Sequence, residues 1–308
     1  MTMNHTDKQG PTKARRLREL IARRVVMMPG AFNALTAMQI ERAGFEAIYV
    51  SGASLAAARG LPDIGLLSMA EVASDAKTIA NAVAIPALAD ADTGYGAPLT
   101  VMRTVREFER AGLAGIHLED QRDPKKCGHL SGKSLIPITE MARKIGAAVE
   151  ARRDPDFLVA ARTDARALEG LEGAVRRARA YARAGADAIF PEALESVEEF
   201  RTFAEHLAKE GVKVPLIANM TEFGKTPYLS AREFEDLGYR IILFPVTALR
   251  IAARGVEEML DKLRSLGTQR ELLGQMQTRE QLHDLLRYED YEKRDKDWYE
   301  RYGREPKD

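Results

Sequence analysis

"IPALADADTGYGAPLTVMRTVREFERAGLAGIHLED", residues 85–120, contains one complete strand–helix–strand unit. The runs 85–92 and 115–120 are short, begin with apolar residues and lack a helical period, which is typical of strands buried on both faces. Between them, the amphipathic stretch 99–115 reaches Ala-Gly shortly before the next strand, and glycine is a common helix stop. The stretch therefore predicts two parallel strands joined by a helix.

The same alternation recurs along the chain. Two strand-like runs lie in residues 85–120, and six more begin at Val25, Ala47, Phe157, Ala188, Val214 and Arg240. Eight such units predict an α/β fold, a (β/α)8 TIM-type barrel with an N-terminal helix and a C-terminal helical extension. A doubly wound open sheet is the alternative. That fold usually has a glycine-rich turn after its first strand, and "MMPGAFNA" (27–34) is not a G-x-G-x-x-G motif.

Composition bounds the function. Basic and acidic residues number 46 each, so no bulk charge favours nucleic acid or an anionic membrane. No apolar run is long enough to span a bilayer, and the single cysteine fits a reducing cytosol. We therefore expect a cytoplasmic protein with a small-molecule partner and neither a nucleic-acid nor a membrane partner. One domain is expected over residues 16–300, between a disordered tail (1–15) and a frayed end (301–308).

Polar residues follow most of the predicted strands, at the end where active sites of this fold are built. Residues two apart on a strand share a face, and burying polar groups is costly unless they converge on a partner. We therefore expect a site formed by six pairs: Tyr49 with Ser51, Asp90 with Asp92, His117 with Glu119, Arg162 with Asp164, Phe190 with Glu192, and Asn219 with Thr221.

Asp90 and Asp92 lie together at the end of the third predicted strand. Paired carboxylates without histidine or cysteine spacing suit a hard cation, which favours Mg²⁺, with Mn²⁺ as the alternative. Glu119, one strand over, completes the predicted metal set directly or through water. A helix cap and loop aspartate pair is the simpler explanation of the two aspartates. For His117, a hydrogen-bonded core histidine is favoured over a direct catalytic role.

Cys127, the only cysteine, lies in the basic stretch "DPKKCGHLSGKS" (123–134). Adjacent cations favour the thiolate, which suggests a proton-transfer group or a nucleophile, whereas the alternative is a chance loop cysteine. Arg162 ends the fifth predicted strand, and guanidinium groups bind carboxylates through two parallel hydrogen bonds. A Mg²⁺ site with arginines and without a phosphate-cradling loop indicates a small polycarboxylate substrate.

Eight motifs resemble those of a known enzyme superfamily, in order: "YVSGAS", "LADADTGYG", "HLEDQ", "KKCGH", "ARTDA", "FPEA", "ANMTEFG" and "MQTR". The series resembles the isocitrate lyase and phosphoenolpyruvate mutase superfamily, and most closely its 2-methylisocitrate lyases, from about Arg16 to about Arg294. The resemblance implies a Mg²⁺-dependent cleavage of 2-methylisocitrate to pyruvate and succinate, a reaction of the methylcitrate cycle in propionate catabolism.

The resemblance also implies roles for individual residues. Cys127 is the expected proton donor to the departing carbanion, and Tyr49 or a metal-bound water or hydroxide is the base. Arg162 is the third expected catalytic residue, because its guanidinium would stabilise the charge that develops on the departing half. Phe190, Leu243 and Pro245 are expected to line a pocket for the methyl group, although all three are equally ordinary core residues. The expected substrate-binding residues are Ser51, Gly52, Ala53, Cys127, Gly128, Arg162, Glu192, Asn219, Met220, Thr221, Arg250 and Arg279. Many relatives carry a second glycine in place of Ala53.

By the same analogy, the chain is expected to form a homotetramer in which helices from about Leu249 to Leu286 are exchanged between subunits. Other members of the superfamily are the alternatives: isocitrate lyase, dimethylmalate lyase, oxaloacetate hydrolase and carboxyphosphonoenolpyruvate mutase. A catalytically inactive barrel that binds metabolites is the alternative of a different class. The presence of Asp90, Asp92, Cys127 and Arg162 argues against that inactive barrel.

Overall fold

The computed structural model of the chain describes residues 10–126, 128 and 132–303. The chain divides into two compact units, Met1–Arg250 and Ile251–Asp308. Cys127 is outside the described residues, so its predicted role stays a prediction.

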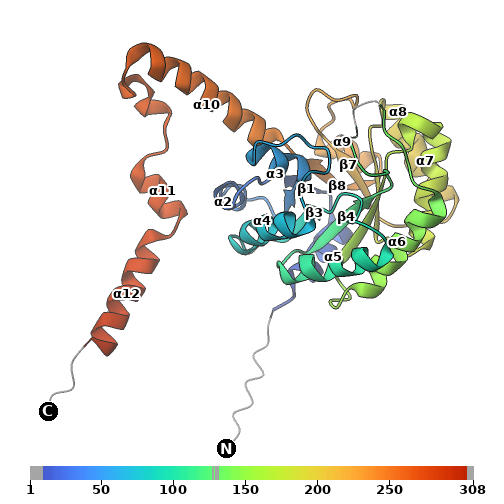
Figure 1. Cartoon of the computed structure of the whole chain (residues 1–308), viewed down its shortest axis with the longest axis horizontal. Coiled ribbons are helices and arrows are strands. Elements are labelled where there is room, and N and C mark those ends of the chain that lie inside the picture. Colours follow the sequence, from blue (N-terminus) through green and yellow to red (C-terminus); the bar gives the residue numbers. More distant parts are fainter. Residues whose placement is uncertain (1–9, 127, 129–131, 304–308) are drawn as a thin grey trace, which may run out of the picture. The chain divides into compact units, whose positions relative to one another are not determined.

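The first unit is a nearly closed ring of eight parallel strands surrounded by helices, as Figure 1 shows, which confirms the predicted barrel. Neighbouring strands follow the order β1-β8-β7-β6-β5-β4-β3-β2. A bridge between Gly30 and Tyr49 brings β1 beside β2, and the Ala31 N–H donates to the Tyr49 carbonyl at 2.8 Å. The strands are β1 (Val26–Pro29), β2 (Ile48–Val50), β3 (Ala87–Asp90), β4 (Gly115–Glu119), β5 (Leu158–Thr163), β6 (Ala188–Pro191), β7 (Leu216–Asn219) and β8 (Tyr239–Phe244).

Helix α5 illustrates how the sequence sets these elements. Its first residue is Pro98. A backbone N–H at this position would have no acceptor within the helix, so proline, which has none, is tolerated there. Val101, Val105 and Phe108 recur every three or four residues and are fully buried. Gly112, at φ +86°, ends the helix where most other residues would be strained. The helices of this unit are α1 (Lys13–Arg23), α2 (Ala34–Arg42), α3 (Gly52–Ala58), α4 (Met69–Asn81), α5 (Pro98–Arg110), α6 (Ile138–Ala151), α7 (Arg166–Arg183), α8 (Val197–Lys209) and α9 (Ala231–Asp236).

Alternation along the strands divides the core into an outer and an inner layer. On β4, Ile116 and Leu118 pack in the outer layer, between the sheet and the helices. Inside the barrel, strand residues such as Met28 form one cluster with Leu17 and Ile21 of α1, so α1 packs on the inner layer. Polar side chains gather at the opposite end of the barrel, where the strands have their carboxyl ends.

The second unit consists of the C-terminal helices. Helix α10 (Thr247–Leu266) begins in the first unit and continues into the second, where it is followed by the 3₁₀ helix η1 (Arg270–Gln275), α11 (Arg279–Leu285) and α12 (Tyr288–Tyr302). The predicted helical extension is therefore present. Many of its large apolar side chains are exposed in the single chain, including Ile251, Leu260 and Trp298. Among the described residues, no helix is both long and apolar enough to cross a bilayer.

A buried ionic network joins α7 to the ends of β4 and β5. The Asp120 carboxylate accepts hydrogen bonds from Thr163 Oγ1 at 2.7 Å, the Asp164 N–H at 2.9 Å and the Tyr181 hydroxyl at 2.8 Å. Arg177 Nη1 lies 3.3 Å from the same carboxylate and donates to the Ile136 carbonyl at 2.9 Å. Because these groups are removed from water, each needs the others as partners.

Replacing Arg177 with methionine is expected to lower the free energy of unfolding by about 3–5 kcal/mol, because the Asp120 charge would stay buried without its cation. The matched control is Arg179→Met on the same helix, since Arg179 pairs with Glu210 at 2.8 Å in a partly exposed position. That control should cost less than about 1 kcal/mol. Urea unfolding measures both values, and equal effects would contradict a stabilising role for the buried network.

Candidate active site

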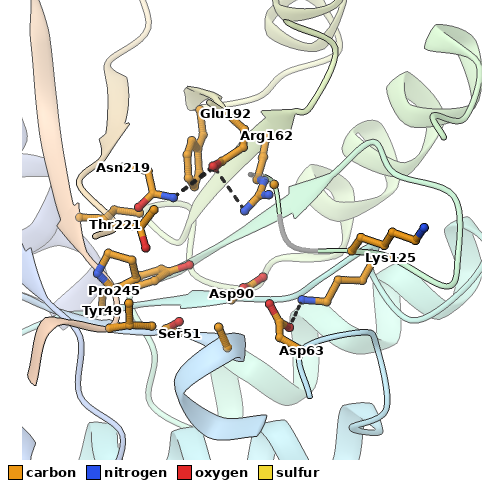
Figure 2. Close-up of a pocket in the computed structure, with 16 residues that line it drawn as sticks. Tyr49, Ser51, Asp63, Asp90, Lys125, Arg162, Glu192, Asn219, Thr221 and Pro245 are labelled. Atoms are coloured by element: carbon orange, nitrogen blue, oxygen red, sulfur yellow. Dashed lines mark hydrogen bonds and ion pairs between the residues drawn. The ribbon is translucent and has the colours of Figure 1, made fainter. Parts of the chain in front are cut away.

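A pocket opens at the carboxyl ends of the strands, and it is lined by residues from seven of the strands, β2 to β8, or from the segments that follow them. Figure 2 shows the lining side chains. The structure thus brings together most of the polar residues that the alternation predicted. Predicted site residues that line the pocket are Tyr49, Ser51, Ala53, Asp90, Gly128, Arg162, Glu192, Asn219 and Thr221. The three residues expected beside a substrate methyl group, Phe190, Leu243 and Pro245, line it as well.

Other predicted residues lie next to this lining or away from it. Gly52 donates its N–H to Asp90 Oδ2 at 3.3 Å, so it adjoins the pocket through that carboxylate. The Met220 side chain packs in the outer core layer. The Arg250 side chain is half-exposed, and its Nε lies 3.5 Å from Glu222 Oε2. Arg279 is the first residue of α11, in the second unit.

The two predicted metal aspartates face a lysine. Lys125 Nζ lies 2.8 Å from Asp92 Oδ1 and also pairs with Asp63, as Figure 2 shows for Asp63. Burial, and then the neighbouring charge of Asp90, raise the pKa of Asp92 to about 6. The Asp92 N–H donates to Asp90 Oδ1 at 3.0 Å, which fixes the two carboxyl groups side by side.

Arg162, at the end of β5, is the centre of a second cluster. Its Nε and Nη2 donate to the two oxygens of Asp164 at 3.0 and 3.1 Å. Nε also lies 3.3 Å from Glu119 Oε2, and Nη1 lies 3.4 Å from Glu192 Oε2. Asn219 Nδ2 donates to Glu192 at 3.2 Å. Four elements therefore hold one guanidinium group in a fixed orientation at the pocket wall.

Tyr49 and His117 form a hydrogen-bonded pair inside the barrel, with 2.6 Å between Tyr49 Oη and His117 Nε2. Burial raises the pKa of Tyr49 well above 10, so the phenol is protonated near neutral pH. Burial also lowers the pKa of His117 to about 4, which keeps the imidazole neutral. His117 is thus hydrogen-bonded, as expected of a core histidine, but its partner lines the pocket.

The buried charges at this end of the barrel fit a divalent cation. Three cations, Lys125, Lys133 and Arg162, face five carboxylates, which leaves two negative charges uncompensated if all are ionised; the carboxylates are those of Asp90, Asp92, Glu119, Asp164 and Glu192. In the described part of the chain, Glu119 Oε1 is buried without a hydrogen-bond partner. Oxygen donors of this kind suit Mg²⁺. Over the same residues, no three acidic, histidine or cysteine side chains already stand as a complete metal site.

Asp63 and Lys125 are pocket residues that sequence reasoning did not assign. In the sequence, Lys125 stands out only as one of the cations near Cys127, and Asp63 belongs to none of the motifs. Asp63 lies in the segment between α3 and α4, after β2, on the side of the barrel where active sites of this fold occur. An acid within "GLPDIG" (60–65) in that segment was the available signal.

Comparison with known proteins is consistent with this geometry. Residues 17–264 match the family described as phosphoenolpyruvate phosphomutase. The chain is 52% identical to the 2-methylisocitrate lyase of Aeropyrum pernix, over 91% of this chain and 89% of that protein. A crystal structure of 2,3-dimethylmalate lyase superposes with a TM-score of 0.87 at 37% identity, covering 94% of this chain and 96% of that one. A phosphonopyruvate hydrolase in complex with oxalate and Mg²⁺ gives 0.83 at 32% identity, with 96% and 100% covered.

Acid should destabilise the metal-free protein through His117. Because the folded protein holds the pKa near 4 and an unfolded histidine titrates near 6.5, protonation favours unfolding as the pH falls through this range. Stability from this group is complete above pH 6.5, and about 2 kcal/mol should be lost between pH 7 and pH 4.5. Urea unfolding of wild type and His117→Gln over this range measures the effect. An unchanged pH dependence in the variant would refute it.

Proposed function

Because the chain belongs to the phosphoenolpyruvate phosphomutase family, we propose that it is a carbon–carbon lyase that cleaves 2-methylisocitrate to pyruvate and succinate. The observation that carries the proposal is the arrangement of the pocket. It combines the fixed guanidinium of Arg162, a pair of carboxylates suited to Mg²⁺, and an apolar wall that a methyl group would contact. The reaction would serve propionate catabolism through the methylcitrate cycle, in the cytoplasm.

The substrate carries three carboxylates, and the pocket offers matching donors. Arg162 already forms two parallel hydrogen bonds with Asp164 through Nε and Nη2, so its Nη1 side is the part directed at Glu192 and the pocket. Asn219 and Thr221 lie on the same wall and offer neutral donors. Fixed donors of this kind stabilise charge that develops on the succinate half as the bond breaks.

Bond cleavage requires the loss of one proton and the gain of another. As the hydroxyl proton leaves, its oxygen becomes the ketone of pyruvate, and the electron pair of the broken bond moves to the succinate carbon. Tyr49 is the proposed base, and its hydrogen bond with His117 at 2.6 Å holds the phenol oxygen in place. A bound divalent cation would have to lower the pKa of this buried phenol before it could take a proton. Cys127 is the proposed donor of the proton that the succinate carbon gains.

Asp90 and Asp92 are the proposed Mg²⁺ ligands, with Glu119 directly or through water. When bound, the ion supplies Lewis acidity that lowers the pKa of the substrate hydroxyl. In the metal-free structure, the ammonium group of Lys125 pairs with Asp92 and partly compensates the charge of the carboxylates that would bind the ion.

Selection of the substrate depends on the apolar wall. Phe190 and Leu243 are almost completely buried, and together with Pro245 they present carbon atoms to the pocket. Contact with one methyl group is worth about 1–3 kcal/mol, so isocitrate should be cleaved about 10- to 200-fold less efficiently.

Coupled assays for the 2-oxo acid product test the proposed function, with pyruvate measured for 2-methylisocitrate and 2,3-dimethylmalate and glyoxylate for isocitrate. We expect Mg²⁺-dependent pyruvate release from 2-methylisocitrate, with kcat/KM at least about tenfold above the values for isocitrate and 2,3-dimethylmalate cleavage. The third comparison is oxaloacetate hydrolysis, which is measured by the oxalate it forms. A higher kcat/KM with any of these substrates would transfer the assignment to that activity, and inactivity with all of them would favour a binding protein.

Replacing Cys127 with serine should lower kcat about a thousandfold or more while leaving KM within about threefold, because a hydroxyl is a much weaker acid than a thiol. Steady-state pyruvate release measures both constants. Ser54→Ala is a useful comparison, because Ser54 is buried beside the pocket and donates to the Pro245 carbonyl at 2.8 Å. A Cys127→Ser enzyme with nearly full kcat would remove the thiol from the mechanism.

We also propose that the C-terminal helices are exchanged within a homotetramer. The exposed apolar residues of α10 and α12 support this, since a second subunit would cover them. Light scattering coupled to size-exclusion chromatography distinguishes a tetramer of the 34.1 kDa chain from a monomer, and a monomer would contradict the exchange.

A further inference from the structure

We propose that Lys133 is a positioning residue that ties the backbone at Gly128 to the carboxylate that orients Arg162. The inference rests on the proposed function only for its effect on turnover, because the tie itself is a structural feature. Lys133 does not line the pocket, so it would act through other groups and not by touching the substrate.

Lys133 is a buried cation with two acceptors in different segments. Its Nζ donates to the Gly128 carbonyl oxygen and lies 3.0 Å from Asp164 Oδ1. Only 2% of the Lys133 side chain is exposed, and Asp164 is fully buried. Burial of an ammonium group costs several kcal/mol unless it is paired, so these two contacts fix where Lys133 can lie.

Asp164 shares its carboxylate between Lys133 and Arg162. Arg162 uses two hydrogen bonds, to Oδ2 and Oδ1, and Lys133 approaches Oδ1. Burial alone would raise the pKa of Asp164, but the charges of Arg162 and Lys133 lower it to about 2, so the bridging group stays ionised at neutral pH. One carboxylate thereby relates the position of Lys133 to the orientation of the proposed substrate-binding arginine.

Gly128 in turn packs directly against the Arg162 cluster. A Cβ atom at this position would lie 2.4 Å from Glu192 Cγ and 2.5 Å from Arg162 Nη2, which is too close for any side chain to be accommodated without movement. The carbonyl that Lys133 holds therefore belongs to a backbone segment in contact with the pocket wall. A change at Lys133 would release that segment from Arg162.

The segment is also held on the other side of Cys127 in the sequence. Gln121 accepts from the Lys126 N–H at 2.9 Å and donates to the Lys126 carbonyl at 2.8 Å. Lys126 and Gly128, the residues immediately before and after Cys127, are thus each hydrogen-bonded through the backbone to a side chain, Gln121 and Lys133 respectively. Of these two ties, the one at Lys133 also reaches Arg162, which singles it out for a catalytic effect.

The test compares Lys133→Met with wild type in the full-length enzyme. We expect kcat for pyruvate release to fall about 100-fold, the loss typical of a small misplacement of reacting groups, while KM changes less than about threefold because Arg162 keeps both bonds to Asp164. Since Cys127 is the only cysteine, alkylation by iodoacetamide reports on this position alone. Its rate constant on the high-pH plateau, where the thiol is ionised, should rise at least about fivefold.

Two further variants make the result decisive. Lys77→Met, an exposed lysine on α4, should leave kcat and the alkylation rate unchanged. Gly128→Ala should reproduce both effects of Lys133→Met by displacing the same backbone. If Lys133→Met does not fold, as judged by its thermal unfolding, the polar and neutral Lys133→Gln replaces it.

Rates of turnover and alkylation within about threefold of wild type in the folded variant would overturn the proposal. A loss of kcat without faster alkylation would overturn the tie to Gly128. If wild type itself releases no pyruvate, the proposed function fails, and the alkylation rates still decide whether Lys133 holds this segment.

Discussion

An excess of buried carboxyl groups over buried cations at the carboxyl ends of the strands is the constraint on which the rest of the site depends. Carboxylates this well removed from water are stable only beside cations, hydrogen-bond donors or a bound metal. The chain supplies Lys125, Lys133 and Arg162 from a loop segment and a strand end, and these three cations would not balance the five carboxyl groups around them if all were ionised. The same imbalance that a folded protein would normally avoid makes this end of the barrel suited to Mg²⁺ and to an anionic substrate.

The barrel stabilises this concentration of charged groups by placing each of them beside a suitable partner. Parallel register places Glu119 beside Arg162 and Arg162 beside Phe190 on adjacent strands, so the guanidinium has a carboxylate on one side and an aromatic ring on the other. Its Cζ lies 5.2 Å from the centre of that ring. Behind the strand ends, Asp120 and Arg177 fasten α7 to β4 and β5. The polar site at one end of the barrel is therefore supported by the apolar interior of the barrel and by the paired charges of Asp120 and Arg177.

The strands and the location of the pocket were predictable because they follow from local pattern. Short apolar runs that end in polar residues predicted both the eight strands and the convergence of residues such as Asp90 and Asn219. The contacts of Asp63 and Lys133 could not be predicted, because loop conformation decides them, and the sequence offered only an acid after β2 as a signal for Asp63. The resemblance alone suggested Arg250 and Arg279. The barrel unit places Arg250 beside Glu222 and outside the pocket lining, and the role of Arg279 stays a prediction.

The central claim is that the paired aspartates at the end of β3 form the metal site of a lyase. Anomalous diffraction from crystals grown with Mn²⁺ and oxalate tests it most directly, because the scattering locates the ion without reference to activity. The account predicts one strong peak within coordination distance of the Asp90 or Asp92 carboxylate, with oxalate between the ion and Arg162. A peak elsewhere would contradict it, and so would the absence of a peak at saturating Mn²⁺ with Lys125 still paired with Asp92.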